Sequence, residues 1–395
     1  MKVRLPCEDI IAVPEHIESI SGIKAFIDQE TQIPSSIQQL YCEQRVLTDD
    51  LTYEAFSNTD IIDLKISIGG RYSINRSGVD EGASECESFT PLKSILKNRD
   101  INLLSAPPKI NVKAPGQKEN GVLLAASYMK AFGTNRAARI GQLRRIRSQL
   151  DEGVVTLSMF NWGYSELFKN WVASCDLNKI DCRRNTLMFP TDEESDSLAR
   201  KLGFRTYFDG QSYGEIPSTA SESFGDGDFR RIIFAKIAMV QDMLEIEGDY
   251  LRQDIDLVWF ADPREALRLK AEKDGLDMMF MADGPNAAHQ PLHYNSGFVF
   301  LKNNPFTRYA WDQIFSNYGQ ILVAGGEQRM INLILNCLKE RGLRTAKLPE
   351  TQYVNGHVFV KTGAVPKNSV VGHASWTSNI EAKKKIMSNL GLWYL

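Results

Sequence analysis

The stretch DYLRQDIDLVWFADP, residues 249–263, decides both the fold and the chemistry of this chain. Its first apolar residues predict a short buried strand, and residues 257–260 form a second apolar run. Asp254 and Asp256 stand one residue apart where the first strand ends. Two carboxylates at this spacing can approach one hard divalent cation, directly or through water. The stretch therefore predicts a strand that ends in a cation-binding turn.

A cation in that turn could bridge two phosphates of a nucleotide-sugar and neutralise charge on a departing nucleoside diphosphate. A pair of aspartates also occurs in surface turns without any metal, so the surrounding sequence has to decide. That sequence alternates between the two kinds of element. We predict strands at 154–158 and 185–189 and helices at 165–174, 192–202 and 229–245. This βαβα order favours a parallel α/β sheet.

The first 70 residues have a pattern of their own. Short apolar runs predict strands near 2–5, 10–13, 39–42, 46–47 and 62–66. Between them, Ile23, Phe26 and Ile27 recur at spacings of three and four, which is the stripe of a helix that covers a sheet, and Ile33-Pro34 ends that helix. The order of these elements is that of a β-grasp fold.

Residues 22–56, GIKAFIDQETQIPSSIQQLYCEQRVLTDDLTYEAF, resemble ubiquitin over the helix and the strands that follow it. The resemblance implies an α+β ubiquitin-like β-grasp domain at 1–70 that recruits a protein partner. Tyr41 and Lys65 stand where ubiquitin has apolar residues of its recognition patch, so ordinary ubiquitin receptors are not the expected partners. Gly69-Gly70 is either a flexible exit from the last strand or a processing site.

Residues 71–121 are rich in Ser, Gly, Pro and charge, which predicts a linker, and residues 122–152 predict a helical lead-in. In the lead-in, the apolar residues of a helix at 135–150 recur at spacings of three and four. The remaining positions hold five arginines, either on a solvent-exposed face or as a grip on phosphates; these are Arg136, Arg139, Arg144, Arg145 and Arg147.

Four segments of residues 153–395 resemble the nucleotide-diphospho-sugar transferase family, close to the group with plant cell-wall xylosyl- and arabinosyltransferases. They are VVTLSMFNWGYSELFKNWVAS (154–174), FAKIAMVQDMLEIEGDYL (234–251), HYNSGFVFLKN (293–303) and GHASWTSNIEAKKKIMSNLGLW (372–393), in addition to the paired aspartates. The resemblance implies an α/β GT-A domain at 153–395, with a Rossmann-like mixed sheet.

The resemblance also implies a metal site. Asp254 and Asp256 match the metal-site aspartates, and His373 matches the late histidine that completes coordination in related retaining transferases. The expected ion is Mn²⁺, with Mg²⁺ as the alternative, and neutral imidazole suits manganese. Lys383 matches the lysine that holds the diphosphate, although Lys384 and Lys385 stand beside it.

The same resemblance assigns residues to the nucleotide-sugar donor, which is expected to be a UDP-sugar. Gln328 would lie beside the anomeric carbon, and Glu327, where the family usually has Asp, would bind donor hydroxyls. Asp283 is a further sugar-facing candidate, with an ordinary strand-end carboxylate as the alternative. The remaining donor-binding candidates are Thr156, Ser158, Asn161, Lys236, Asn295, Ser296 and Gly297. For the first three of them, an ordinary polar loop is the alternative.

These expectations describe a metal-dependent glycosyltransferase that moves a sugar to a hydroxyl acceptor, a protein or a glycan, with retention. A non-catalytic adaptor with a degenerate transferase fold is the alternative, and a donor hydrolase is a third possibility. Basic and acidic residues number 46 and 49, so no general attraction to nucleic acid is expected. The chain has no run of roughly 20 apolar residues, no secretory leader pattern and no CxxC pair. We expect a cytoplasmic protein without disulfides.

Overall fold

A computed structural model of the chain describes most of the predicted transferase domain and parts of the first 66 residues. The predicted linker at 71–121 and Gly69-Gly70 lie outside the described residues. Those that are described are 2–4, 10–13, 17, 19–31, 38–42, 45–47, 61–66, 128, 130–210, 213, 216–221, 227–286, 289–317, 321, 327–339 and 342–395.

The N-terminal sheet contains five strands: β1 (Lys2–Arg4), β2 (Ile10–Ala12), β3 (Gln38–Cys42), β4 (Arg45–Leu47) and β5 (Ile61–Ile66). Their order is β2-β1-β5-β3-β4, and β1 runs parallel to β5. Helix α1 (Ile20–Thr31) buries Ile20, Ile23 and Ile27. The strands and the helix fall where the sequence predicts them. The assignment to a ubiquitin-like domain stays a prediction.

The second sheet has seven strands in the order β13-β11-β12-β9-β6-β7-β8. Strand β12 runs antiparallel to both of its neighbours, and the other pairs are parallel. This arrangement confirms a mixed α/β sheet. The strands are β6 (Val155–Phe160), β7 (Thr186–Pro190), β8 (Arg205–Thr206), β9 (Tyr250–Gln253), β11 (Met278–Ala282), β12 (Tyr294–Leu301) and β13 (Thr345–Lys347).

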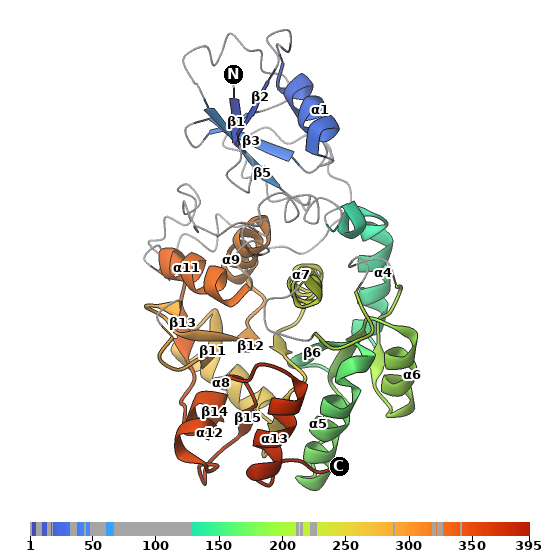
Figure 1. The fold of residues 1–395 in the computed structure, drawn as a ribbon, viewed down its shortest axis with the longest axis vertical. Coiled ribbons are helices and arrows are strands. Elements are labelled where there is room, and N and C mark those ends of the chain that lie inside the picture. Colours follow the sequence, from blue (N-terminus) through green and yellow to red (C-terminus); the bar gives the residue numbers. More distant parts are fainter. Residues whose placement is uncertain are drawn as a thin grey trace.

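Helices cover both faces of this sheet (Figure 1). Leu157 and Met159 of β6 join one apolar cluster, whereas Phe160 joins the other, as expected when successive side chains point to opposite faces. The first cluster includes residues of α4 (Arg136–Arg147), α7 (Gly227–Met243), α9 (Pro305–Ser316) and α11 (Glu327–Lys339). The second includes residues of α5 (Ser165–Leu177), α6 (Glu193–Lys201) and α8 (Arg264–Asp274).

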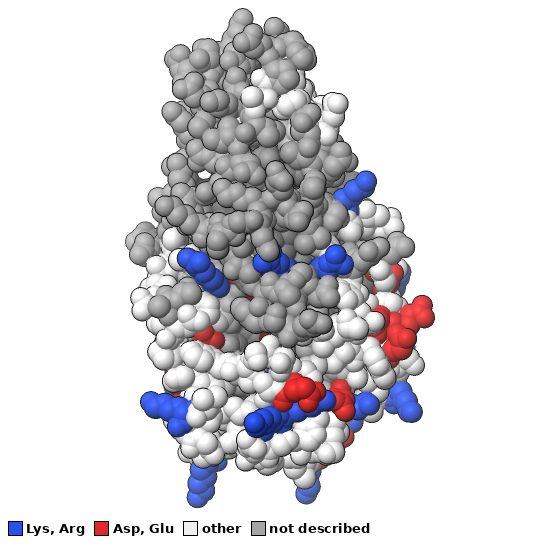
Figure 2. Space-filling view, in the orientation of Figure 1, with Lys and Arg blue, Asp and Glu red and all other residues white. Residues whose placement is uncertain are grey.

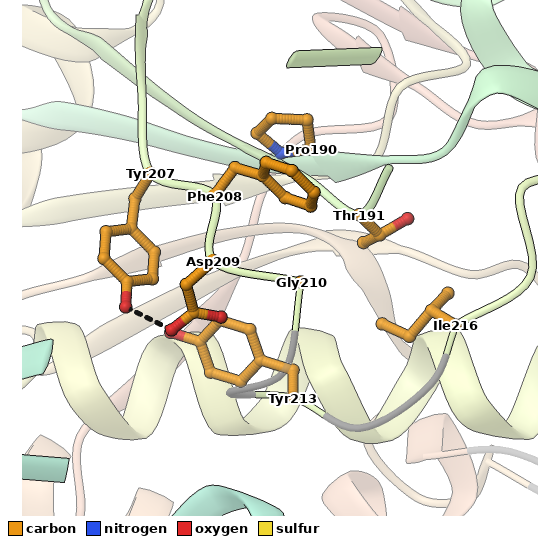
Figure 3. A pocket seen from close by; sticks show the side chains of 8 residues that line it. All are labelled: Pro190, Thr191, Tyr207, Phe208, Asp209, Gly210, Tyr213 and Ile216. Carbon is orange, nitrogen blue, oxygen red and sulfur yellow. Dashed lines mark hydrogen bonds between the residues drawn. The ribbon is translucent and has the colours of Figure 1, made fainter. Parts of the chain in front are cut away.

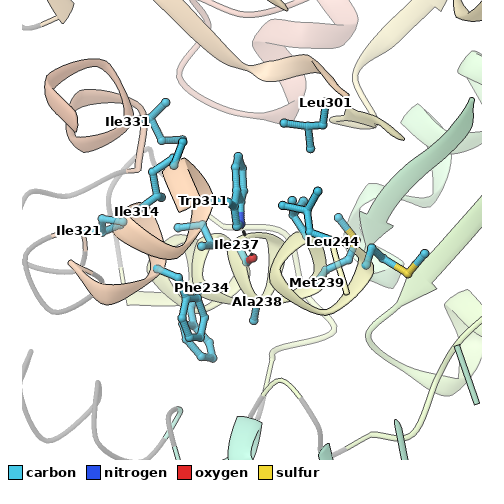
Figure 4. Packing of buried hydrophobic residues seen from close by; sticks show 14 of the residues in the cluster. Phe234, Ile237, Ala238, Met239, Leu244, Leu301, Trp311, Ile314, Ile321 and Ile331 are labelled. Atoms are coloured by element: carbon cyan, nitrogen blue, oxygen red, sulfur yellow. Dashed lines mark hydrogen bonds between the residues drawn. The ribbon is translucent and has the colours of Figure 1, made fainter. Parts of the chain in front are cut away.

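Helix α7 packs in the middle of the first cluster, against α9 (Figure 4). Phe234 and Ile237 of α7 lie near Trp311 and Ile314 of α9, and all four side chains are buried. The indole nitrogen of Trp311 donates to the carbonyl oxygen of Ile237 at 3.0 Å, which satisfies the polar atom of this buried ring. The packing fixes α7 relative to the sheet, and α7 carries Lys236.

A third, small sheet of order β10-β15-β14 lies next to the end of β9. It consists of β10 (Leu257–Trp259), β14 (Tyr353–Val354) and β15 (Val371–His373), and α12 (Gly356–Thr362) and α13 (Ile380–Asn389) follow β14 and β15 in the chain. In the antiparallel pair of β10 and β15, Leu257 lies opposite His373. This register brings the late histidine beside the turn that carries the two aspartates.

The arginine-rich helix α4 differs from the exposed helix that its composition suggests. Arg139 is buried, and its Nε atom donates to Asp242 of α7 at 2.7 Å. Arg136 bonds to the same carboxylate at 3.0 Å and also pairs with Glu245. For these two arginines, the partner is an internal carboxylate on α7, because a buried guanidinium requires a nearby opposite charge. Arg144 remains exposed, as expected.

Among the described residues, no helix is long and apolar enough to cross a bilayer. Figure 2 shows lysine and arginine side chains interspersed with acidic ones over the described part of the visible face. This distribution agrees with the near balance of charges in the sequence.

Candidate functional site

The two aspartates of the turn after β9 are held by backbone hydrogen bonds to two other segments. The amide of Asp254 donates to the carbonyl oxygen of Gly297 in β12 at 2.7 Å, and the carbonyl oxygen of Asp256 accepts from Ala374 at 3.0 Å. Together with His373, the two carboxylates offer three ligand atoms within 4.8 Å of one another. Side chains from residues 254, 256 and 373 therefore meet at the carboxyl end of β9.

Two lysines compensate the charge of these carboxylates. Lys236 Nζ lies 2.6 Å from Asp254 Oδ1, and Lys383 Nζ lies 2.6 Å from Asp256 Oδ2. Burial would raise the pKa of Asp254, but Lys236 and Arg252 outweigh it and lower this pKa to about 2. The pKa of Asp256 lies well below its usual value, because Lys383 and His373 outweigh the effect of burial. Both aspartates are therefore ionised at neutral pH.

The donor set fits a divalent cation. Two ionised carboxylates and one imidazole are ligands that manganese accepts. His373 Nε2 lies 3.3 Å from Asp256 Oδ1, and its ring is buried. Asp254, whose side chain is about one quarter exposed, is the most accessible of the three groups. The side chains of Asp254, Asp256 and His373 are thus suited to hold one ion and are called the metal-ligand cluster below.

Gly297 lies directly behind the metal-ligand cluster. A Cβ atom at this position would contact the imidazole ring of His373 and would lie 2.7 Å from Asp254 Oδ2. Its amide donates to the side-chain oxygen of Asn295 at 2.8 Å, and Asn295 Nδ2 donates to Asp283 Oδ1 at 2.9 Å. Glycine is therefore required here for close approach of β12 to the ligands, and Asn295 is oriented by two hydrogen bonds.

Glu327 is linked to the metal-ligand cluster by Arg252. The Nη2 atom of Arg252 donates to Glu327 Oε1 at 3.2 Å and lies 3.6 Å from Asp254 Oδ1. Ser296 Oγ donates to the same Glu327 oxygen at 3.1 Å. Arg252 is 2% exposed on its side chain, and its charge helps to lower the pKa of Asp254. The carboxylate of Glu327 thus already accepts hydrogen bonds from two donors.

Gln328 and Asp283 are joined through a histidine that the sequence analysis did not select. His289 Nδ1 lies 2.6 Å from Asp283 Oδ2 and 3.1 Å from Gln328 Nε2. A carboxylate can only accept, so the proton is assigned to His289 Nδ1 and is donated to Asp283. Gln328 Nε2 and His289 Nδ1 are then both donors, so they do not bond to each other. The N–H groups of Gln328 can instead donate to a ligand oxygen. Its own oxygen accepts from the amide of Ser296 at 2.9 Å.

Three of the donor-binding candidates lie in strand β6 or directly after it: Thr156, Ser158 and Asn161. Thr156 and Ser158 lie inside β6 and are buried, and Ser158 Oγ donates to the carbonyl oxygen of Gln253 at 3.2 Å. Asn161 follows β6 directly, before the short helix η3 (Trp162–Tyr164), and its side chain donates to the carbonyl oxygens of Pro217 and Thr219. Asn161 therefore organises the loop at the carboxyl end of β6.

A pocket opens beside this loop, past the carboxyl ends of β7 and β8 (Figure 3). Tyr207, Phe208 and Tyr213 supply aromatic walls, and Asp209 accepts a hydrogen bond from the Tyr207 hydroxyl at 2.6 Å. The remaining lining residues are Pro190, Thr191, Gly210 and Ile216. In parallel sheets, ligands bind at the carboxyl ends of the strands, and this pocket lies at that edge.

The structure thus brings together eleven of the fourteen candidates, and it adds Arg252 and His289. A charged residue inside an otherwise buried strand is a usable signal, because buried charges are paired, and it could have identified Arg252. His289 stands in a Pro- and Gly-containing loop without any spacing signal. Of three consecutive lysines, Lys383 reaches the site, whereas Lys384 pairs with Glu166.

A curated plant protein is similar to this chain. The chain is 24% identical over 265 residues to the β-arabinofuranosyltransferase RAY1 of Arabidopsis thaliana, which covers 60% of this chain and 47% of the relative. The chain therefore spans about half the length of the curated relative that it matches.

Two solved glycosyltransferase structures are among those similar to this chain. The galactosyltransferase LgtC, solved with donor and acceptor sugar analogues, matches 60% of this chain and 95% of its own, with a TM-score of 0.39 and 11% identity. The glycosyltransferase GlyE of Streptococcus pneumoniae TIGR4 matches 60% of each chain, with a TM-score of 0.39 and 12% identity.

The family model of the nucleotide-diphospho-sugar transferases matches residues 182–387. The matched range contains the paired aspartates, Asn295 of β12, the pair Glu327-Gln328, and both His373 and Lys383. Strand β6 and Asn161 lie before it. Because the match covers more than half of the chain, this protein belongs to the nucleotide-diphospho-sugar transferase family and has its GT-A fold.

Proposed function

We propose that this protein is a metal-dependent glycosyltransferase that moves a sugar from a UDP-sugar to a hydroxyl group of a protein or a glycan. The observation that carries the proposal is the meeting of Asp254, Asp256 and His373, with one lysine beside each aspartate. Asp254, Asp256 and His373 would hold a Mn²⁺ or Mg²⁺ ion, which would supply positive charge that offsets the negative charge of the diphosphate. Lys383 is positioned to add a point charge on the same diphosphate.

The order of the strands supports one position for the nucleoside. The pocket lined by Tyr207 and Tyr213 lies past the ends of β7 and β8, and the aspartates lie past the end of β9. Two strand spacings separate β9 from β7, about 10 Å. An extended nucleoside diphosphate suits a span of this order, with its base at the aromatic pocket and its phosphates at the aspartates. Asn161 lies between the two places.

The chemistry at the anomeric carbon involves Gln328, Glu327 and Asp283. The acceptor oxygen bonds to this carbon while the bond to the diphosphate oxygen breaks, and the diphosphate takes the bonding electrons and the acceptor proton. Gln328 has N–H groups to offer to the sugar, and Glu327 and Asp283 would bind its hydroxyls. Retention of configuration is part of the proposal through the family resemblance.

The N-terminal region would recruit a protein partner. The strand order β2-β1-β5-β3-β4 supports a ubiquitin-like domain at residues 1–70. The cytoplasmic location, and the division into a linker at 71–121, a lead-in at 122–152 and a transferase domain at 153–395, stay predictions.

The test is turnover of nucleotide-sugars. Purified protein is incubated with Mn²⁺ and a panel of nucleotide-sugars, and release of nucleoside diphosphate is followed. One donor should be consumed, and Asp254→Asn should lower its turnover by at least ~100-fold, because the cation loses a ligand. Asp274→Asn, which changes an exposed carboxylate at the end of α8, is the matched control and should leave turnover unchanged. A chain that binds UDP and Mn²⁺ without turnover under any condition would instead be an adaptor.

A further inference from the structure

Trp376 is an exposed tryptophan close to the proposed site. It stands three residues after His373, and 44% of its surface is exposed. Single exposed apolar residues are common on protein surfaces, so exposure alone means little. The way in which this ring is held is more informative.

The backbone of Trp376 adopts φ of 60°, in the left-handed region. That conformation is unfavourable for a bulky side chain, and such residues persist where the surrounding structure holds them. Here the indole N–H donates to the carbonyl oxygen of Asp283, and the ring of His357 lies 5.0 Å away on one side. Gly284, with φ of 87°, leaves the space that a Cβ atom would take from His357 and Trp376. The ring is therefore fixed in a defined orientation.

Asp283, which fixes the ring of Trp376, also bonds to two polar side chains of the proposed site. Asp283 accepts from the indole through its backbone oxygen, and its two carboxylate oxygens bond to Asn295 and His289. With the proton on Nδ1, the Nε2 atom of His289 is a hydrogen-bond acceptor. No hydrogen bond to that atom is found among the described residues. Asp283 thus holds both a rigid aromatic ring and a histidine that can bond to a hydroxyl.

A sugar ring has the matching chemistry. One face of a pyranose or furanose presents C–H bonds that pack on an aromatic ring, and its edge presents hydroxyls that need polar partners. A peptide acceptor with a serine or threonine hydroxyl offers no comparable flat surface. We propose that Trp376 and His289, both held by Asp283, form the acceptor subsite and that the acceptor is a carbohydrate. This inference rests on the proposed glycosyltransferase function and narrows its acceptor to one class.

A second tryptophan provides a control of equal exposure. Trp162 is also 44% exposed, but it lies on η3 at the end of β6, with Lys169 Nζ 5.9 Å from its ring centre. The metal-ligand cluster lies past the end of β9, the strand next to β6. A non-specific effect of removing an exposed indole should therefore be the same at both positions, whereas a subsite effect should occur only at Trp376.

The experiment measures carbohydrate binding separately from turnover. Saturation-transfer NMR with methyl glycosides of glucose, galactose, xylose and arabinose is recorded on the full chain with UDP and Mn²⁺. At least one glycoside should bind, Trp376→Ala should weaken it roughly tenfold, and Trp376→Phe should restore part of the affinity. Trp162→Ala should bind glycosides like the wild type, and binding of UDP should be equal in the wild type and in both Trp376 variants.

His289→Gln separates the hydroxyl contact from a structural role. It should weaken glycoside binding and raise the KM for a glycoside acceptor by a larger factor than it changes the affinity for UDP, whereas a structural role would lower both affinities together. The inference is overturned if no glycoside binds although UDP and Mn²⁺ do, if hydroxyl-containing peptides accept the sugar and glycosides do not, or if Trp376→Ala and Trp162→Ala act alike. Absence of both UDP binding and donor release, with glycosides bound through Trp376, would instead reject the proposed function and keep the carbohydrate site.

Discussion

Helix α7 contributes to two buried clusters of charge that are built in different ways. Near one end, Asp242 meets Arg136 and Arg139 of α4. Further along, Lys236 meets Asp254 at the end of β9. Both clusters bury ionised groups, and the energetic cost of burial has to be offset in each. They differ in how completely their hydrogen-bonding groups are used.

The α4–α7 cluster is well satisfied. Arg139 donates to Asp242 and to the carbonyl oxygens of Phe132 and Thr134, and its guanidinium lies 4.8 Å from the Phe132 ring centre and 5.5 Å from that of Tyr213. The hydroxyl of Tyr213 donates to Asp242 at 3.2 Å. Burial raises the pKa of Asp242, although the two arginines act against that rise. The cluster therefore joins α4 to α7 as a structural contact.

In the site at the end of β9, fewer of the buried polar atoms have hydrogen-bond partners. Buried polar atoms without a hydrogen-bond partner include Arg252 Nη1, Gln253 Nε2 and His373 Nδ1. Its cations are mainly lysines, which bind as mobile point charges and can turn to a substrate phosphate. Buried polar groups are normally hydrogen-bonded, and the nucleotide-sugar of the proposed function would supply partners here. The fully bonded charges of the first cluster hold two helices together, whereas the second cluster keeps polar atoms that a substrate would bond to under the proposed function.

The largest effect should come from the satisfied cluster. Arg139→Met leaves Asp242 as a buried carboxylate with one remaining arginine, and this should lower the free energy of unfolding by about 3 to 5 kcal/mol. Arg144→Met, on the exposed side of α4, should change it by less than about 0.5 kcal/mol. Urea unfolding followed by circular dichroism measures both. Equal stability of the two variants would contradict the structural role of the cluster.

The next effect concerns Lys383 and its neighbour. Lys383→Gln removes a charge from the proposed diphosphate site and should reduce kcat/KM for the donor roughly 10- to 100-fold. Lys384→Gln removes the same charge one residue later, where the partner is Glu166 on α5, and should leave kcat/KM within about twofold. Steady-state release of nucleoside diphosphate measures both variants, and a shared loss would mean that only the net charge of α13 matters.

A smaller effect is expected from Gly297→Ala. The added methyl group would push on His373 and Asp254, so affinity for Mn²⁺ should fall about tenfold or more. Gly141→Ala places a methyl group where no atom lies within 4 Å, on helix α4, and should leave metal affinity unchanged. Calorimetric titration with Mn²⁺ gives both values. Unchanged affinity in Gly297→Ala would show that the ligands move without cost.

The smallest effect is a dependence of stability on pH. Burial raises the pKa of Asp312 in α9 to about 6, although Arg136 acts against the rise. The unfolded chain has the usual pKa of about 3.9, so it loses this proton first, and stability falls as pH rises from about 4 to 6. Asp312→Asn should therefore be more stable than the wild type by about 1 to 2 kcal/mol above pH 6 and equal to it below pH 4. Unfolding curves at pH 4, 5, 6 and 7 measure the difference, and a gap that stays constant with pH would exclude Asp312 as its source.

Part of the fold and of the site could be predicted from the sequence because it depends on neighbours in the chain. The alternating elements from β6 to β9 follow from apolar periodicity, and the paired aspartates follow from their position after β9. His373 and Lys383 came from a resemblance, and no local pattern indicated that they would reach Asp256. Arg139 was expected on an exposed face, because its buried partner stands about one hundred residues later on α7.

The sequence by itself determined the elements, the mixed sheet and the turn that ends in two aspartates, because short-range periodicity and strand-end chemistry are local properties. The tertiary structure alone decided which side chains complete that turn. The register of β10 against β15 places His373 beside the turn, and the lack of a side chain at Gly297 lets β12 approach it. Asp283 holds His289 through its carboxylate and Trp376 through its backbone oxygen. These contacts join residues far apart in the chain, so only the folded backbone sets their distances.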